Sequence, residues 1–389
     1  MKRLTFGMRR AASLAAAGFA LQLAGCAELS NLLTPQAGAA KPASLVEFKP
    51  GAALRALWQA SAGAAANYSL QPAMVEGGVV VVDAAGHVIA LDTQTGKQLW
   101  NVDAGSKISG GVGSGEELLL LGTPKGYVLA YDSKGRFLWR TEVSSEVLAA
   151  PQRAGAVVVV RTGDGRIFGL DAADGKRKWV YQRPLPALSL RSDAGVLING
   201  STVYAGFAGG KLVALNLVNG NLVWEATVSQ PRGSTELERI ADITSSPILT
   251  GRAVCAVAYQ GRVACFDSKN GNPLWTKELS STTGLAVDEQ NIYVTDERGA
   301  VIALAKDSGT LVWKQDKLAG RKVSAPLVHG NNLVVGDFEG YVHVLAIGDG
   351  AFVARLATDG SPIRVRPTAL EKNFAVQTAN GGLYALTIQ

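Results

Sequence analysis

The side chains best suited to acid–base, metal or redox chemistry are few and widely spaced in this 389-residue chain. Its three histidines, His87, His329 and His343, show no metal-ligand spacing. His343 takes a position that Ile, Leu, Phe, Val and Ala hold in similar segments, so we expect a strand residue rather than a base. The chain also lacks the GxSxG, phosphate-loop and HExxH motifs. We therefore predict no catalytic residue, no metal ligand and no cofactor.

Two of the three cysteines, Cys255 and Cys265, lie in one predicted hairpin, VCAVAYQGRVACFD. If residues 259–261 form its loop, the two thiols face each other across the hairpin. An oxidising compartment permits a disulfide, whereas directly opposed cysteines fit disulfide geometry poorly. This geometry favours two small core residues over a bridge, and both alternatives stay open. Neither suggests redox chemistry, because the chain has no CxxC motif.

Acidic residues recur at predicted turns, and a glycine follows each within four positions. An Asp side chain can accept a hydrogen bond from the backbone two residues on, and glycine supplies the positive φ that such turns need. Carboxylates also bind metals, but the turns require them in any case, so we expect a structural role. The aspartates are Asp92, Asp132, Asp171 and Asp267.

These turns belong to a repeat that first reads GHVIALDTQTGKQLW at residues 86–100. Similar copies end in Trp at 126–139, 165–179, 210–224, 261–275 and 299–313. A weaker copy starts at Gly340, where Ala354 takes the Trp position, and the last starts at Gly381 and stops before its Trp. The missing end lies near the N-terminus, in ALRALW ending at Trp58, so all seven tryptophans occupy one repeat position.

A period near 40 residues with short alternating strands is typical of a β-propeller. Each unit buries only one face by itself, so neighbouring units must stack and the ring must close. We predict an all-β, eight-bladed propeller of four-stranded antiparallel blades. The strand at 54–60 should complete the blade begun by 367–389, which leaves no open edge. The leading glycines of the eight blades are Gly86, Gly126, Gly165, Gly210, Gly261, Gly299, Gly340 and Gly381.

The first residues read as a secretory signal peptide, residues 1–25. A basic start precedes an apolar run at 11–23 that is too short to span a bilayer. The following LAGC resembles the bacterial lipoprotein processing site, which implies acylation of Cys26, and Ala27 after it resembles an outer-membrane signal. The less favoured alternatives are ordinary cleavage and twin-arginine export. We expect residues 26–44 to be the acylated Cys and a flexible tether, and 45–389 to be the propeller.

The basic balance of the chain does not indicate a nucleic-acid partner. Lys and Arg total 38 against 32 Asp and Glu, and the pI is about 9.2. Four of the positive charges lie in the first ten residues, which leaves only about +2 for the remainder.

Two consecutive inter-blade linkers are longer than the others, from Trp179 to Val196 and from Trp224 to Pro247. All such linkers emerge on one face of a propeller, and neighbouring insertions there usually mark a binding surface. Residues 183–191 (RPLPALSLR) are largely apolar, and 229–244 are mostly polar with Asp242 near the end. This composition suits protein docking. Alternatively, Leu188 and Leu190 fold back onto the rim as a local plug.

The repeat GxVxALDxxTGxxLW resembles that of pyrroloquinoline-quinone (PQQ) dehydrogenases, which typically carry a vicinal cysteine pair that this chain lacks. The chain more closely resembles the BamB family of outer-membrane assembly lipoproteins, through Cys26, SLVEFKPGAALRALW (44–58), ALSLR (187–191) and GSTELERIADIT (233–244). The resemblance covers nearly the whole mature chain. It implies that Leu188, Leu190, Arg191 and Asp242 dock BamA, although Thr244 replaces the second acid of the family's loop.

The resemblance implies a non-catalytic scaffold, lipid-anchored to the periplasmic face of the outer membrane. Its expected partners are BamA, the β-barrel assembly complex and nascent outer-membrane proteins, with the membrane reached only through the lipid anchor and no nucleic acid bound. The alternative is a periplasmic PQQ-type quinoprotein dehydrogenase. A polysaccharide-binding propeller ranks last, because every Trp is used by the repeat.

Overall fold

The computed structural model describes residues 41–115 and 117–389. The predicted signal peptide, Cys26 and nearly all of the tether lie outside these residues. Ala43–Gln389 forms one compact unit. Its strands form eight four-stranded sheets, and the described part of the chain contains no helix long and apolar enough to cross a membrane.

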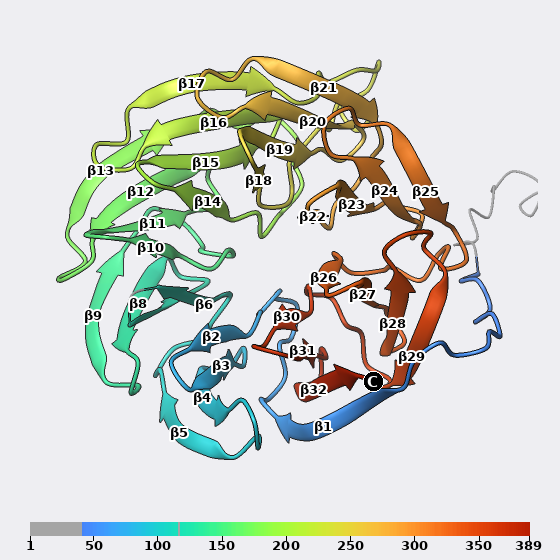
Figure 1. The fold of residues 1–389 in the computed structure, drawn as a ribbon. Helices are drawn as coiled ribbons and strands as arrows, with labels where there is room; N and C mark the ends of the chain where they lie inside the picture. The colour runs from blue at the N-terminus through green and yellow to red at the C-terminus, as the bar shows by residue number, and fades with distance from the viewer. Residues whose placement is uncertain (1–40, 116) are drawn as a thin grey trace, which may run out of the picture. The chain divides into compact units, whose positions relative to one another are not determined.

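The eight sheets are the blades of a closed ring (Figure 1). We number them in chain order: β2–β5 form blade 1, each following set of four strands forms the next blade, and β30–β32 with β1 form blade 8. The eight-bladed all-β propeller predicted from the repeat is therefore confirmed. All strand pairs are antiparallel. Each pair joins strands that are neighbours in sequence, except that β1 pairs with β32.

The strands fall into four concentric sets, from the centre of the ring outward. The innermost are β2 (Ala73–Val75), β6 (Gly110–Gly115), β10 (Gln152–Ala154), β14 (Val196–Asn199), β18 (Ile248–Thr250), β22 (Leu285–Val287), β26 (Leu327–His329) and β30 (Thr368–Ala369). The second are β3 (Gly78–Val82), β7 (Leu118–Gly122), β11 (Val157–Arg161), β15 (Thr202–Phe207), β19 (Ala253–Val257), β23 (Asn291–Thr295), β27 (Asn332–Gly336) and β31 (Phe374–Gln377). The third are β4 (His87–Asp92), β8 (Tyr127–Asp132), β12 (Arg166–Asp171), β16 (Lys211–Asn216), β20 (Arg262–Asp267), β24 (Val301–Ala305), β28 (Tyr341–Ala346) and β32 (Gly382–Ile388). The outermost are β5 (Gln98–Asp103), β9 (Phe137–Glu142), β13 (Arg177–Gln182), β17 (Leu222–Thr227), β21 (Pro273–Glu278), β25 (Leu311–Gln315), β29 (Phe352–Ala357) and β1 (Leu54–Ser61).

The ring closes where the two ends of the described chain meet. β1 pairs with β32 from Leu54 opposite Ile388 to Ser61 opposite Gly382. The predicted closure is thus confirmed, and the last blade has the same four strands as the others. Since both strands are satisfied by this pairing, the seam presents no additional unpaired edge.

Each tryptophan joins its own blade to the next one. The indole of Trp139, on β9 of blade 2, lies against Gly175, which forms the turn between the last two strands of blade 3. Its Nε1 donates a 3.0 Å hydrogen bond to the Ala172 carbonyl of the same turn. The other six tryptophans donate equivalent bonds of 2.8–3.1 Å, so each of the seven indoles lies between two neighbouring blades.

The repeat lacks a tryptophan only where its receiving turn is missing. Ala354, on β29 of blade 7, is buried and faces blade 8. In blade 8 the last two strands are β32 and β1, which belong to opposite ends of the chain and share no turn. An indole here would have neither the turn glycine nor the turn carbonyl that the other seven contact. The weak seventh copy of the repeat is therefore a consequence of the seam.

The start of the described chain is held on blade 7. Arg321 donates to the Ala43 carbonyl and Arg355 to the Val46 carbonyl, at 3.1 and 3.0 Å. Phe48 stacks on Phe352, with ring centroids 5.4 Å apart. Part of the segment before β1 is therefore fixed to the ring, although we expected the tether to extend to residue 44.

The buried side chain of His343 lies under this segment. Its Nε2 donates to Asp337 at 2.9 Å, and its Nδ1 accepts from Nε of Arg355 at 3.2 Å. Both bonds are satisfied by one neutral tautomer, and burial holds the pKa of His343 below its ordinary value. His343 is a residue of β28, as predicted, and it belongs to the structural core.

Cys255 and Cys265 form a disulfide, which corrects the preferred prediction of two unpaired core thiols. The expectation that they face each other across the hairpin is confirmed, since they are direct register partners. Their Cα atoms are only 4.1 Å apart. The close spacing is that of a non-hydrogen-bonded antiparallel pair, where side chains approach most closely.

The turn aspartates hold the backbone of their own turns. In blade 1, Oδ1 of Asp92 accepts from the backbone of Gln94 and Thr95 at 3.1 and 2.7 Å. Gly96 in the same turn has a φ of +67°. No group of three or more His, Cys, Asp and Glu side chains able to hold a metal gathers in residues 41–115 and 117–389.

Candidate docking site

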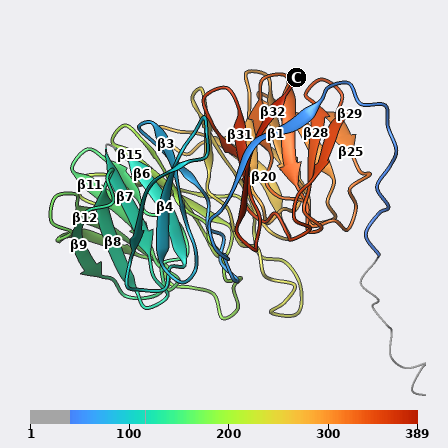
Figure 2. The same cartoon turned by 90° about the horizontal axis from the view of Figure 1, so that it is seen from below.

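The two long linkers are neighbours on one face of the ring. The first insertion, residues 183–195, joins blades 3 and 4, and the second, residues 228–247, joins blades 4 and 5. Figure 2 shows the second insertion as a yellow loop that projects beyond the strands. The insertions are linked directly, because the backbone N of Gly195 donates to Oγ of Ser246 at 3.1 Å. The predicted placement side by side is confirmed.

Asp242 of the second insertion holds the first insertion in place. Its Oδ2 accepts a 2.7 Å hydrogen bond from the backbone N of Leu190. Its Oδ1 accepts a 2.9 Å bond from Gly209, on the turn between β15 and β16. The Asp242 residue is only 3% exposed. Sequence reasoning places this carboxylate among the docking residues, and the structure places it beneath the surface as a clamp.

Arg191 is the next residue along the first insertion, and its guanidinium faces solvent. Nε and Nη2 bind the two carboxylate oxygens of Glu146 at 3.0 and 2.8 Å. The hydrogen bond to Glu146 raises the pKa of Arg191. The guanidinium also lies 5.7 Å from the ring centroid of Tyr68. Its contacts with Glu146 and Tyr68 hold Arg191 in one orientation. Its outer side stays accessible, because 53% of the side chain remains exposed.

Leucines of both insertions are exposed on the surface, and Leu185 and Leu190 line the same pocket as Arg191. Leu185 and Leu188 are 42% and 45% exposed, and Leu237 at the tip of the second insertion is 67% exposed. Leu190 is partly buried. The alternative in which Leu188 and Leu190 both plug the rim does not match these exposures, since Leu188 stays largely open to solvent. We call Leu185, Leu188, Leu190, Arg191 and Leu237 the docking patch.

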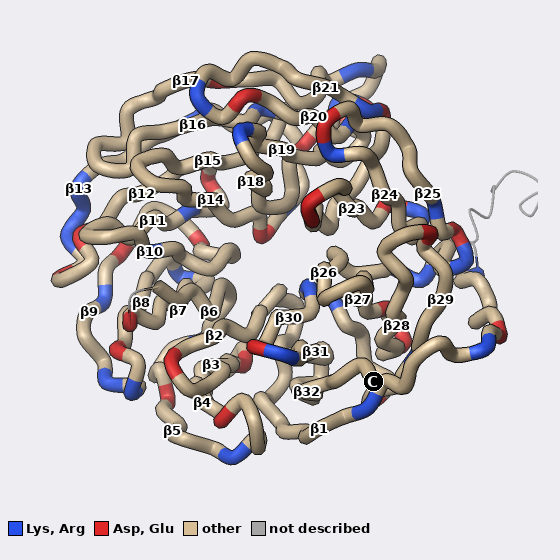
Figure 3. The backbone as a smooth tube through the Cα atoms, in the orientation of Figure 1, with Lys and Arg blue, Asp and Glu red and all other residues tan. Residues whose placement is uncertain are grey.

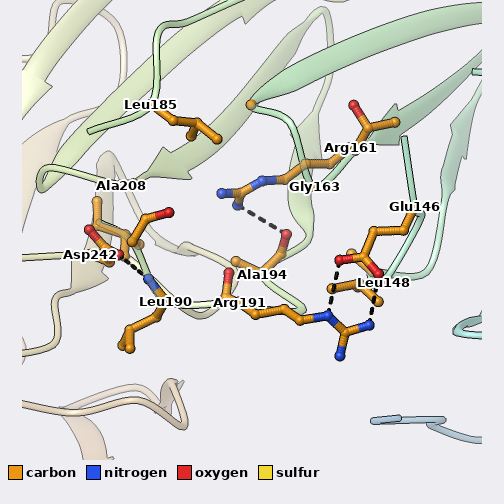
Figure 4. A pocket seen from close by; sticks show the side chains of 16 residues that line it. Glu146, Leu148, Arg161, Gly163, Leu185, Leu190, Arg191, Ala194, Ala208 and Asp242 are labelled. Atoms are coloured by element: carbon orange, nitrogen blue, oxygen red, sulfur yellow. Dashed lines mark hydrogen bonds and ion pairs between the residues drawn. The ribbon is translucent and has the colours of Figure 1, made fainter. Parts of the chain in front are cut away.

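A pocket of about 270 Å³ lies beside the docking patch (Figure 4). Arg161, at the end of β11, lines it and donates to the Ala194 carbonyl at 3.0 Å. Burial lowers the pKa of Arg161 to about 10, against the opposing effect of Asp193 and Asp242. Arg161 and Asp242 therefore both hold the first insertion in place, through Ala194 and Leu190 respectively.

Thr244 stands where a second loop acid was expected from the family resemblance. It is buried, and its hydroxyl donates to the Thr282 carbonyl at 3.1 Å. The threonine therefore ties the second insertion to the linker that leads into blade 6, and it offers no charge to a partner.

Glu146, Tyr68 and Arg161 support the site but were not predicted. Glu146 lies in the linker 143–151, whose length is ordinary for this ring, and Tyr68 precedes the first innermost strand. Neither carries a motif. The only usable signal is positional, because every inter-blade linker reaches this same face.

The fold defines the chain as an eight-bladed propeller with quinoprotein-like repeats, and the two linked insertions are its departure from regularity. A family model described as outer membrane protein assembly factor BamB matches residues 54–107, 84–315 and 298–389. A protein of that name from Nitrosomonas eutropha is 44% identical over 94% of this chain and 92% of its own length. One from Bordetella pertussis is 41% identical over 93% of each chain. The chain belongs to the BamB family.

Solved structures agree with this assignment at the level of the fold. The crystal structure of BamB from Moraxella catarrhalis superposes with a TM-score of 0.80 at 29% identity, covering 86% of this chain and all of that one. A quinohemoprotein alcohol dehydrogenase from Comamonas testosteroni superposes with a TM-score of 0.71 at 14% identity, over 86% of this chain and 76% of that one. The likeness to the dehydrogenase, at 14% identity, concerns the propeller fold alone.

Proposed function

We propose that this chain is a non-catalytic scaffold of the outer-membrane β-barrel assembly machinery and that it docks BamA through the docking patch. The observation that carries the proposal is the link between Leu190 and Asp242, which fixes two exposed insertions as one surface. Membership of the BamB family, whose members are named outer-membrane assembly factors, supplies the biological setting.

The composition of the patch suits a protein partner. The patch combines exposed leucines with an arginine whose position is set by a two-point bond to Glu146. Arginine and large apolar side chains at the centre of an interface contribute most of its binding energy. Because Arg191 is already ordered, less side-chain entropy is lost when a partner covers it.

Asp242 has a supporting role in this proposal rather than a contact role. Its carboxylate is buried under the insertions and accepts backbone hydrogen bonds from Leu190 and Gly209. We infer that it positions the contact residues and does not itself touch BamA.

The proposed anchor is Cys26, acylated after removal of residues 1–25. It would hold the ring on the periplasmic face of the outer membrane, where nascent outer-membrane proteins pass BamA. The test is incorporation of labelled palmitate into the full-length chain. Cys26→Ser should abolish the label and release the protein from membranes, and continued labelling would contradict the assignment.

The interface is tested by co-purification of BamA with the membrane-anchored protein. Leu190→Ala combined with Arg191→Ala should abolish co-purification while the thermal unfolding midpoint changes little. The matched control is Leu311→Ala with Lys314→Ala, an exposed apolar and basic pair on β25 far around the ring. The control should retain BamA. Full recovery of BamA with the Leu190 and Arg191 variant would refute the interface.

The dehydrogenase alternative has its own direct test. Purified protein supplied with pyrroloquinoline quinone and Ca²⁺ should show no alcohol-dependent dye reduction. Tight quinone binding with turnover would replace the scaffold proposal.

A further inference from the structure

The centre of the ring contains a second polar pocket, separate from the docking patch. Its volume is about 230 Å³, and the segments entering or forming the innermost strands of all eight blades contribute lining residues. Lys, Arg, Asp and Glu lie mainly on the outer strands and turns, and few lie near the centre (Figure 3). Among the eight innermost strands, only β10 contains one of these residues, Arg153.

Two arginines enter this sparsely charged centre on the segment before β30. Arg364 donates to the Ala66 carbonyl at 2.7 Å and is exposed. Arg366 reaches across to blade 6, where its Nη2 donates to the Leu285 carbonyl. Both line the pocket.

The guanidinium of Arg366 is incompletely satisfied. Its Nε is shielded from solvent and has no hydrogen-bond partner among residues 41–115 and 117–389. Within residues 41–115 and 117–389 Arg366 makes no ion pair, and burial lowers the pKa of Arg366 without any opposing carboxylate. A largely desolvated cation without an anion costs considerable free energy, so this arrangement favours an anion in the pocket beside the guanidinium.

The rest of the lining favours a singly charged, peptide-like group over a multiply charged ion. Ser69, Gln71, Gln152 and Ser246 provide hydroxyl and amide groups that can bond to a peptide backbone. The pocket also contains one acid, the exposed Asp193, which disfavours high negative charge. A carboxylate matches both the single charge and the planar donor geometry of a guanidinium.

We propose that the central pocket binds a carboxylate of an extended peptide, with Arg366 as the charged ligand and the surrounding amide and hydroxyl groups holding the adjacent backbone. The carboxylate is a chain terminus or an acidic side chain. The central pocket and the docking patch share no residue, so this site goes beyond BamA docking. Short peptides test it without BamA.

The test is a titration of the full-length protein, kept in mild detergent, with short peptides. Binding is measured by saturation-transfer NMR of the peptide signals. The probes are acetyl-tetraalanine with a free carboxylate, its C-terminal amide, and acetyl-Ala-Asp-Ala-Ala amide. We expect saturable binding of at least one carboxylate-bearing peptide, with a Kd of about 1 mM or tighter, and none of acetyl-tetraalanine amide. The two carboxylate peptides distinguish a chain terminus from a side chain.

Variants show whether Arg366 is responsible. Arg366→Gln should weaken binding about tenfold or more, because it removes a charge-assisted hydrogen bond. Arg366→Lys keeps the charge but lacks Nε, so it should also weaken binding, and it serves if Arg366→Gln unfolds. The matched control Arg252→Gln alters an exposed arginine on the turn between β18 and β19, at the opposite face, and should bind normally.

Three outcomes would overturn the proposal. The first is that neither carboxylate peptide shows saturable binding. The second is that the wild type and both Arg366 variants bind the peptides equally well. The third is that the two carboxylate peptides do not displace each other, while inorganic phosphate binds in the pocket.

Discussion

The backbone nitrogen of Leu190 donates to the buried carboxylate of Asp242 across a separation of 52 residues. The same carboxylate also accepts from Gly209. One side chain therefore joins both insertions to the turn between β15 and β16, and the shape of the docking patch depends on it.

Replacing Asp242 should loosen the docking patch without opening the ring. Asp242→Ala leaves the partly buried backbone N–H groups of Leu190 and Gly209 without their acceptor, which should lower the free energy of unfolding by about 1–3 kcal/mol. Amides of residues 183–195 should exchange faster with solvent, and BamA co-purification should fall. Asp174→Ala, at an exposed turn, should change none of these. Unaltered exchange in the first insertion would contradict the clamp.

The contact between Trp139 and Gly175 makes a prediction about the stacking of blades. A Cβ on Gly175 would clash with Oγ1 of Thr141 and lie 2.5 Å from Cε3 of Trp139, and the φ of Gly175 is +72°. Gly175→Ala should therefore cost about 3 kcal/mol or more, measured by urea unfolding. Gly200 also has positive φ, but an added Cβ there meets nothing within 4 Å. Gly200→Ala should cost only about 1 kcal/mol, and equal losses would exclude a role for the indole contact.

His343 predicts a loss of stability on acidification. Its folded pKa lies below the ordinary 6.5 because it is buried, so below pH 6.5 the unfolded chain binds a proton that the folded chain does not. The stabilising contribution is present above that pH and is lost as the pH falls toward the folded value. His329 acts in the same direction, whereas His87, paired with Asp83, acts in the opposite one.

The test is the free energy of unfolding in urea between neutral and mildly acidic pH. Gln can accept from Arg355 and donate to Asp337 as the neutral imidazole does, so His343→Gln should reduce the slope against pH while keeping the fold. An unchanged slope, or an imidazole signal that titrates near 6.5 by NMR, would show that His343 is not held neutral.

The disulfide predicts sensitivity of blade 5 to reductant. Cys255→Ala with Cys265→Ala should lower the free energy of unfolding by about 2–3 kcal/mol, the range for closing a loop of this length. Dithiothreitol should destabilise the wild type and leave the double variant unaffected. Reactivity of both thiols toward alkylation in the non-reduced, unfolded protein would show that the bridge is not formed.

Periodicity made the ring predictable. A tryptophan and a turn glycine recur at fixed spacing, each has one geometric role, and linker length alone located the insertions. Support for the docking patch was less predictable, because Glu146 and Tyr68 come from linkers of ordinary length and meet Arg191 only after the blades are stacked. The burial of Asp242 was missed for a similar reason, since sequence shows that an acid is present but not whether backbone N–H groups surround it.

Ala354 and the cysteine pair show two further limits of sequence reasoning. In the sequence, Ala354 indicates only a weakened copy of the repeat. The reason for the missing tryptophan becomes visible in the structure, where β1 and β32 have no common turn. The cysteines were correctly placed opposite each other, but the register decides whether such a pair is closely or widely spaced.

The hold of Arg321 and Arg355 on residues 43 and 46 has a mechanical consequence. Tension on the N-terminus reaches blade 7 before it reaches β1, the strand that closes the ring. The two arginines thus shield the seam from peeling, and this shielding should matter most when the ring is pulled from its N-terminal end. In an optical trap, Arg321→Ala with Arg355→Ala should lower the force at which β1 detaches, and an unchanged rupture force would show that the load bypasses blade 7.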